Sequence, residues 1–87
     1  MYLVIVYDVA QKRVSKVCNF LRIHLNWVQN SVFEGEITKS QLMEIREGLK
    51  QIIEQDRDSI LLFSIQNKKW LEREIIGMEK NPTGNVI

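Results

Sequence analysis

Side chains that build metal and redox sites are scarce in this sequence of 87 residues. It has one cysteine, Cys18, and one histidine, His24. A single cysteine excludes an internal disulfide and a cysteine-rich zinc site, and it fits a reducing cytoplasm. The spacing of Cys18 from neighbouring apolar residues predicts a packed core thiol. His24 is expected at the end of a helix, as a solvated or capping residue.

Long apolar runs and motifs of familiar enzymes are also missing. No apolar stretch approaches the roughly 20 residues of a membrane span, and no signal peptide is expected at the N-terminus, so we expect no membrane partner. The sequence contains no glycine-rich phosphate loop, no paired-histidine motif and no identifiable Ser-His-Asp set. Any chemistry must therefore come from a sparser group of side chains.

The size and composition indicate one small folded domain. Hydrophobic residues make up 45% of the chain, which argues against disorder. A chain of this length buries only about 60–65% of its unfolded surface, so a second copy would add useful apolar burial. We therefore expect a homodimer of one domain, residues 1–80, followed by a loop-like C-terminal tail, residues 81–87.

Hydrophobic periodicity divides the chain into strands and helices. A continuous β-branched and aromatic run at 2–8 predicts a buried strand, whereas apolar residues three and four positions apart predict helices. Thr38 and Gln41 fit a capping box at the start of the second helix. The predicted order is strand 2–8, helix 11–25, one bent or two short strands within 27–35, helix 38–55, strand 59–65 and a short edge strand at 75–78.

This order predicts an α+β, ferredoxin-like βαββαβ fold with an extra C-terminal edge strand. Two helices would cover one face of an antiparallel sheet. The other face would then need a cover, which again favours a dimer formed sheet to sheet. The segment 75–78 could pair with the edge of its own sheet or of a partner's sheet.

Charge is segregated along the chain although the net charge is only +1. Residues 1–33 hold four bases and one acid, residues 34–58 hold four bases and seven acids, and residues 59–87 hold four bases and three acids. A dimer would double the basic face of the first helix and could bind nucleic acid, although a solvated face without a ligand explains the same pattern. The candidate nucleic-acid contacts are Lys12, Arg13, Lys16 and Arg22.

Asp8 is the one acid that precedes Glu34, and it ends the first predicted strand beside the basic helix. One or two carboxylates suffice for Mg²⁺ when a phosphate and waters complete its shell. Two Asp8 side chains across a dimer axis would meet that need, and the ion could activate water for phosphodiester cleavage. The alternative is structural: Asp8 caps the first helix or pairs with Lys12 or Arg13.

Other candidates favour structural roles. The acids of the second helix, Glu44, Glu47 and Glu54, alternate with bases and indicate a solvated, salt-bridged face. Glu34 and Glu36 alternate at a strand end and are expected to face water. Trp27 and Phe33 could stack on bases, but aromatic residues in strands more often belong to the core.

Specific motifs resemble a known family. Tyr7-Asp8 follows an apolar strand and precedes a basic helix, and the run Val28-Gln29-Asn30-Ser31-Val32-Phe33-Glu34-Gly35 comes next. Together they resemble the second of the numbered CRISPR-associated protein families, the small nuclease-like subunit of spacer acquisition. The second run is the more specific of the two. Length, element order and the ending Asn85-Val86-Ile87 extend the resemblance over nearly the whole chain.

The resemblance implies a ferredoxin-like homodimer in which the last strand joins the partner's sheet. It implies that the two Asp8 carboxylates lie near the dimer axis and hold Mg²⁺, or Mn²⁺ in its place, between them. Tyr7 and Arg13 match an aromatic and a basic position near the family's catalytic site, and Phe33 matches an aromatic of the second motif.

The family resemblance also implies an activity and partners. It predicts a metal-dependent endonuclease that cleaves single-stranded RNA or duplex DNA, and an adaptation protein that binds duplex DNA and bridges two dimers of the CRISPR integrase. One departure is Trp27, where relatives often carry an Arg, so Arg13 or Arg22 would have to supply that contact. The alternative is a ferredoxin-like toxin-type ribonuclease, or a non-catalytic RNA-binding module, outside CRISPR.

Overall fold

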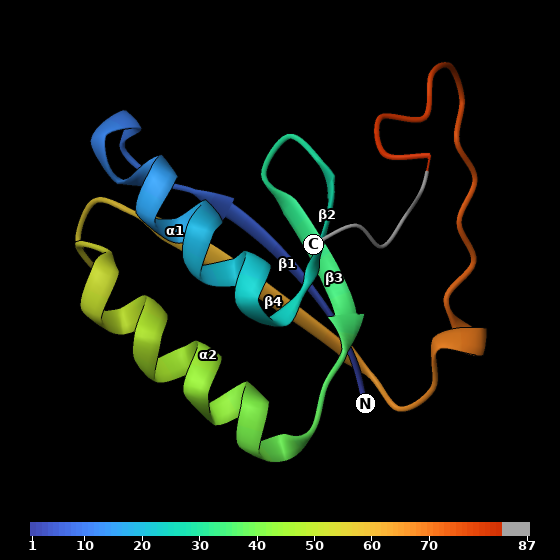
Figure 1. The fold of residues 1–87 in the computed structure, drawn as a ribbon, viewed down its shortest axis with the longest axis horizontal. Coiled ribbons are helices and arrows are strands. Elements are labelled where there is room, and N and C mark those ends of the chain that lie inside the picture. The colour runs from blue at the N-terminus through green and yellow to red at the C-terminus, as the bar shows by residue number, and fades with distance from the viewer. Residues whose placement is uncertain (83–87) are drawn as a thin grey trace.

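The computed structural model describes residues 1–82 and shows a four-stranded sheet with two helices packed on one of its faces (Figure 1). The predicted α+β, ferredoxin-like fold is confirmed. Most of the expected tail, residues 81–87, lies outside the described residues. Within residues 1–82, no helix is long and apolar enough to cross a membrane. The elements are β1 (Tyr2–Asp8), α1 (Gln11–His24), β2 (Asn26–Gln29), β3 (Val32–Glu36), α2 (Lys39–Ile52), β4 (Ser59–Ile65) and the 3₁₀ helix η1 (Lys68–Trp70).

β1 is a central strand because its side chains are apolar on both faces. The sheet order is β2-β3-β1-β4, and every neighbouring pair is antiparallel. Leu3, Ile5 and Tyr7 point toward the helices and are 0–5% exposed. The opposite face carries the alternate residues of the strand, as the two-residue period of a strand requires.

The core lies between the sheet and the two helices. α1 contributes Val17 and Leu21, and α2 contributes Ile45 and Leu49, all of which are buried. Thr38 and Gln41 form the predicted capping box at the start of α2, with Gln41 N donating to Thr38 Oγ1 at 3.1 Å. Each helix therefore uses one apolar stripe for the core and leaves its polar side in solvent.

The residues 27–35 form two short strands rather than one bent strand. A turn at Asn30 and Ser31 joins β2 to β3, and Asn30 adopts a positive φ of 46°. Asparagine accepts this left-handed conformation more readily than most residues. The turn brings β3 back beside β1, where Phe33 pairs with Ile5.

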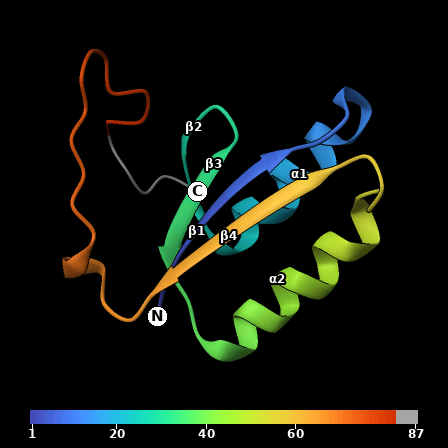
Figure 2. The same ribbon diagram turned by 180° about the vertical axis from the view of Figure 1, so that it is seen from behind.

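Both helices lie behind the sheet in Figure 2, and on the face turned away from them the apolar side chains of β4 are exposed and those of Val4 and Val6 of β1 are half-buried. Val4 and Val6 of β1 pair directly with Phe63 and Leu61 of β4, so these four side chains share that face. Phe63 and Leu61 are 56% and 53% exposed. Asp8 ends the same row of side chains, opposite Ser59.

The expected extra strand at 75–78 is not formed within this chain. Residues 71–82 contain no strand, and Gly77 adopts a φ of 98°, which interrupts an extended run. The segment lies along the β2 edge and is held by side chains: Arg73 forms an ion pair with Glu34, and Asn81 Nδ2 donates to Trp27 O at 2.6 Å. Ile76 and Met78 are left 91% and 74% exposed.

Gly48 of α2 lets the two helices approach closely. A Cβ atom at this position would lie 2.1 Å from Phe20 Cζ of α1. The close contact at Gly48 is therefore with the neighbouring helix. The absence of a side chain here makes room for the Phe20 ring, which also packs edge-on against His24 at 5.6 Å.

We predict that Gly48→Ala lowers the free energy of unfolding by about 1 kcal/mol, because displacing Phe20 outweighs the gain in helix propensity. Urea unfolding of the single variants and the double variant measures this effect. In a Phe20→Ala background the same change should stabilise the protein by about 1 kcal/mol, as in an ordinary exposed helix. Equal effects of Gly48→Ala in both backgrounds would contradict the steric explanation.

Candidate metal and nucleic-acid site at the end of β1

Asp8 occupies the last position of β1 with its side chain in solvent. Its backbone pairs with Ser59, the first residue of β4. Among residues 1–82 its carboxylate makes no hydrogen bond or ion pair, and α1, whose N-cap residue is Ala10, has no side-chain cap. The cap and the ion pairs considered as structural alternatives for Asp8 are therefore not formed among these residues, and Asp8 is exposed to solvent.

The donor chemistry at Asp8 fits a hard cation only in part. Carboxylate oxygens are ligands that Mg²⁺ prefers, but it needs six oxygens in all, some of them from water. Within the described residues, no group of three or more His, Cys, Asp or Glu side chains could hold a metal ion. One chain thus supplies a single exposed carboxylate, and a second copy of Asp8 would be needed to complete a protein site.

Tyr7 lies on the helix side of the sheet, opposite to Asp8. It is 5% exposed, and its ring stacks on Phe33 with centroids 6.2 Å apart. Burial, followed by a hydrogen bond with the Cys18 thiol, raises the pKa of Tyr7 to about 12. Tyr7 and Phe33 are therefore packed core side chains in this chain, in agreement with the core role favoured for Phe33.

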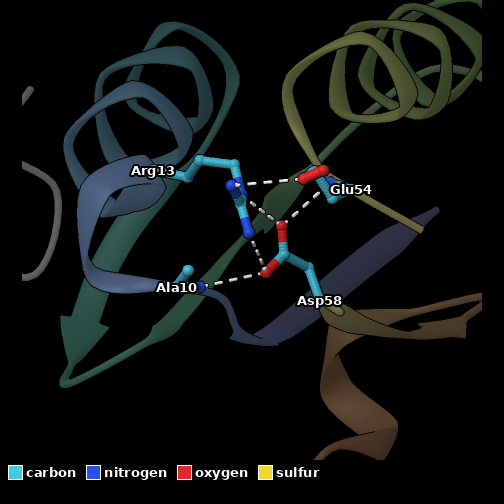
Figure 3. A network of polar contacts seen from close by, with 4 residues as sticks. All are labelled: Ala10, Arg13, Glu54 and Asp58. Atoms are coloured by element: carbon cyan, nitrogen blue, oxygen red, sulfur yellow. Dashed lines mark hydrogen bonds and ion pairs between the residues drawn. The ribbon is translucent and has the colours of Figure 1, made fainter. Parts of the chain in front are cut away.

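Arg13 was predicted to contact nucleic acid from the basic face of the first helix, but its side chain is only 10% exposed. Its guanidinium donates two hydrogen bonds to the Asp58 carboxylate: Nε lies 2.5 Å from Oδ2, and Nη2 lies 3.0 Å from Oδ1 (Figure 3). Glu54 adds a longer contact at 3.9 Å. The Arg13 guanidinium is thus buried and paired with Asp58, and it is not directed toward a phosphate in solvent.

Asp58 is the centre of this network. Its side chain is fully buried, and it also accepts hydrogen bonds from the backbone N–H groups of Ala10 and Glu54 at 3.0 and 2.9 Å. The Arg13 hydrogen bond holds the pKa of Asp58 well below its usual range, and the same contact raises the pKa of Arg13. Both groups are therefore ionised at neutral pH.

The other predicted nucleic-acid contacts are exposed. Lys12 and Lys16 lie one turn apart on the solvent side of α1, and Arg22 is exposed near its C-terminal end. In the part of the chain that the structure describes, none of the three forms an ion pair. All three belong to the helix layer, whereas Asp8 lies on the sheet face without helices.

The sequence did not predict two buried carboxylates that pair with arginines, Glu34 and Asp58. Glu34, expected to face water, is only 7% exposed because Arg73 pairs with it and Tyr2 hydrogen bonds to it. Asp58 lies between the predicted helix 38–55 and the predicted strand 59–65 and was given no role. The topology offered a signal for Asp58, because the end of β1 and the start of β4 are neighbours in this fold. An acid before β4 and a base in the first turn of α1 must then lie close together.

Comparison with known proteins assigns this arrangement to a family. The sequence model of the family described as "CRISPR associated protein Cas2" matches residues 1–73. The chain belongs to the Cas2 family. Family membership confirms the resemblance found in the sequence, and it argues against a toxin or an RNA-binding module outside CRISPR.

Relatives in the Cas2 family align over the full length of the chain. A protein of Pyrococcus furiosus is 52% identical over 87 residues, with all of both chains covered. A protein of Methanocaldococcus jannaschii is 51% identical, covering all of this chain and 76% of the relative. Both relatives are named CRISPR-associated endoribonuclease Cas2.

Solved structures support the same assignment. A crystal structure of a Cas2 protein superposes with a TM-score of 0.87 at 41% identity, covering 100% of this chain and 98% of the other. Cas2 of Streptococcus pyogenes gives a TM-score of 0.74 at 32% identity, covering 88% of this chain and 100% of the other. The fold and the family are therefore in agreement.

We predict that neither tyrosine of the folded protein ionises before pH approaches 12. Burial raises the pKa of Tyr2, as of Tyr7, from 10.0 to about 12. The raised values contribute stability that is complete below pH 10 and is lost as pH rises toward 12. Tyrosinate absorbance should rise near pH 12 in the native protein and near pH 10 in urea. Native ionisation of either ring near pH 10 would contradict the buried positions.

Proposed function

We propose that this Cas2-family chain is a Mg²⁺-dependent endoribonuclease that acts as a homodimer, with one Asp8 from each copy at a shared site. The observation that carries the proposal is the position of Asp8. Asp8 is exposed and forms no ion pair within residues 1–82, and it ends a row of apolar side chains that includes Val6, Leu61 and Phe63 on the sheet face without helices.

A second copy is the occupant that best fits this sheet face. The face is apolar along β1 and β4, so burying it would stabilise a dimer by removing apolar area from water. A two-fold axis through this face would place the two β1 strands opposite each other. The two Asp8 side chains, which end those strands, would then be brought near one another.

The residues of the chain have separate roles in the proposed reaction. Asp8 would hold Mg²⁺, or Mn²⁺ in its place, and orient the phosphate group of the substrate. When bound, the ion polarises a phosphoryl oxygen and lowers the pKa of a bound water. Tyr7 supports the strand that carries Asp8 through its stacking on Phe33, so its proposed catalytic role is indirect. Arg13 likewise acts through Asp58 and not through substrate.

We predict that Asp8→Asn lowers the rate of RNA cleavage at least about 100-fold, because an amide binds Mg²⁺ far less well than a carboxylate. Cleavage of single-stranded RNA and of duplex DNA is followed with Mg²⁺, with Mn²⁺ and with chelator. Asp56→Asn serves as the control, since Asp56 is another exposed acid. Equal cleavage by wild type and Asp8→Asn would show that the activity arises elsewhere.

The second proposed function is binding of duplex DNA during spacer acquisition, with the dimer bridging two integrase dimers. Lys12, Lys16 and Arg22 favour it, because they are exposed and form no ion pair within residues 1–82, and cationic side chains along one helix can contact a phosphate backbone. A dimer would carry two such faces. The site at Asp8 is not required for this role.

We predict that replacing Lys12, Lys16 and Arg22 with Gln weakens duplex binding and lowers the salt dependence of log Kd by about one unit per lost phosphate contact. Fluorescence anisotropy over a series of salt concentrations measures both quantities, with and without integrase. The matched control replaces Lys39, Arg46 and Lys50 of α2, which removes the same charge from the other helix. Equal losses in the two triple variants would contradict a specific α1 face.

A further inference from the structure

The buried Asp58 has more contacts than a simple structural ion pair requires. Its two carboxylate oxygens accept four hydrogen bonds, two from the Arg13 guanidinium and two from the backbone N–H groups of Ala10 and Glu54. Burying charges is expensive, and a buried ion pair often adds little to stability compared with apolar residues of the same size. What such a pair does provide is one fixed arrangement of the segments that it joins.

Asp58 joins two segments that are distant in the sequence, the one that follows β1 and the one between α2 and β4. Ala10 lies in the turn after β1, Arg13 in the first turn of α1, and Glu54 in the loop after α2 (Figure 3). The contacts between Asp58 and the first two span 48 and 45 residues. α1 has neither a side-chain cap nor an acidic residue in its first turn, so the Asp58 carboxylate supplies the negative charge at that helix end.

The same contacts hold the backbone around Asp8 on both sides. Asp8 pairs with Ser59 in the sheet, and Ser59 directly follows Asp58. Two residues after Asp8, the N–H of Ala10 donates to Asp58 Oδ1. The turn that follows Asp8 is thus hydrogen-bonded to Asp58, the residue that precedes Ser59, with which Asp8 pairs in the sheet. With no bond to its own carboxylate, Asp8 takes its position from this backbone.

We infer that Asp58 is a positioning residue for the Asp8 site: by holding the Ala10 N–H it sets where the Asp8 carboxylate stands, and with it the affinity for a divalent cation. This inference rests on the proposed function of Asp8. Groups that orient metal ligands typically change metal affinity 10- to 100-fold when they are lost. Two carboxylates that share one ion must also meet within about 0.5 Å of a productive geometry.

Ala10→Pro removes the tether and leaves the ion pair in place. Ala10 has a φ of −59°, which suits proline, so the backbone of residue 10 itself is not strained. Proline lacks the N–H that donates to Asp58, and its ring carbon would push the turn away from the Asp58 carboxylate. Ala10→Ser is the matched control, because it keeps the N–H.

Binding of Mn²⁺ to the whole protein at neutral pH tests the inference without relying on activity. The electron paramagnetic resonance signal of free Mn²⁺ reports binding, Asp8→Asn gives the background, and circular dichroism reports the folded state. We expect Ala10→Ser to match wild type and Ala10→Pro to bind Mn²⁺ at least about tenfold more weakly while it remains folded. The Mg²⁺ concentration for half-maximal cleavage should rise in parallel.

A second variant covers the case in which Ala10→Pro does not fold. The double change Arg13→Met with Asp58→Leu replaces the buried pair by apolar side chains, which often preserves folding. It leaves Ala10 without its acceptor, whereas Arg13→Met with Asp58→Asn retains an oxygen for the Ala10 N–H. The positioning role predicts weak Mn²⁺ binding in the first double variant and binding within about threefold of wild type in the second.

The outcomes separate the two hypotheses. If wild type and Asp8→Asn bind Mn²⁺ equally, the proposed function is overturned and the positioning role falls with it. If Asp8→Asn loses binding but folded Ala10→Pro and both double variants bind like wild type, the positioning role alone is overturned. A loss in both double variants that simply follows their melting temperatures would also overturn it, because a merely stabilising pair predicts that result.

Discussion

The fold depends on a single strand that is apolar on both faces. β1 pairs with β3 and β4 and directs Leu3, Ile5 and Tyr7 into the helix layer. Two helices of 14 residues each can cover only one face of the sheet. The alternate side chains of β1 therefore meet the side chains of β4 on a face that this chain leaves open. The position of Asp8 on the open face follows from this arrangement, in which the helices cover one face of the sheet and leave the other exposed.

Asp8 and Arg13, which the sequence analysis assigned to one site, differ in exposure because only Arg13 has a buried partner. Asp8 and Arg13 are only five positions apart, yet one is in solvent and the other is enclosed with Asp58. A buried guanidinium needs a carboxylate partner, since an unpaired charge in the interior is very costly. Asp8 is left free because Asp58 satisfies that need. The exposed acid and the buried base are thus two results of one network.

Much of the fold could be predicted from the sequence because its signals are local. The run 2–8, the apolar stripes of the helices and the capping box at Thr38 each depend on residues within one element. The burial of Arg13 and Glu34 could not be predicted in this way, because their partners lie 45 and 39 residues away. The strand expected at 75–78 is not formed on this chain's own sheet, because apolar composition alone does not specify a strand. Its pairing with a partner's sheet stays a prediction.

Within residues 1–82, the pairing of β1 with β4 joins the first strand to the last, from Tyr2 opposite Ile65 to Asp8 opposite Ser59. As the chain leaves the ribosome, β1 emerges early, but one of its edges has no partner until β4 has been made. An apolar strand with an open edge is a site for aggregation during that interval. The sheet is therefore complete only once β4 has been made, and a chain that stops before β4 would expose an apolar strand with an open edge instead of forming a shorter domain.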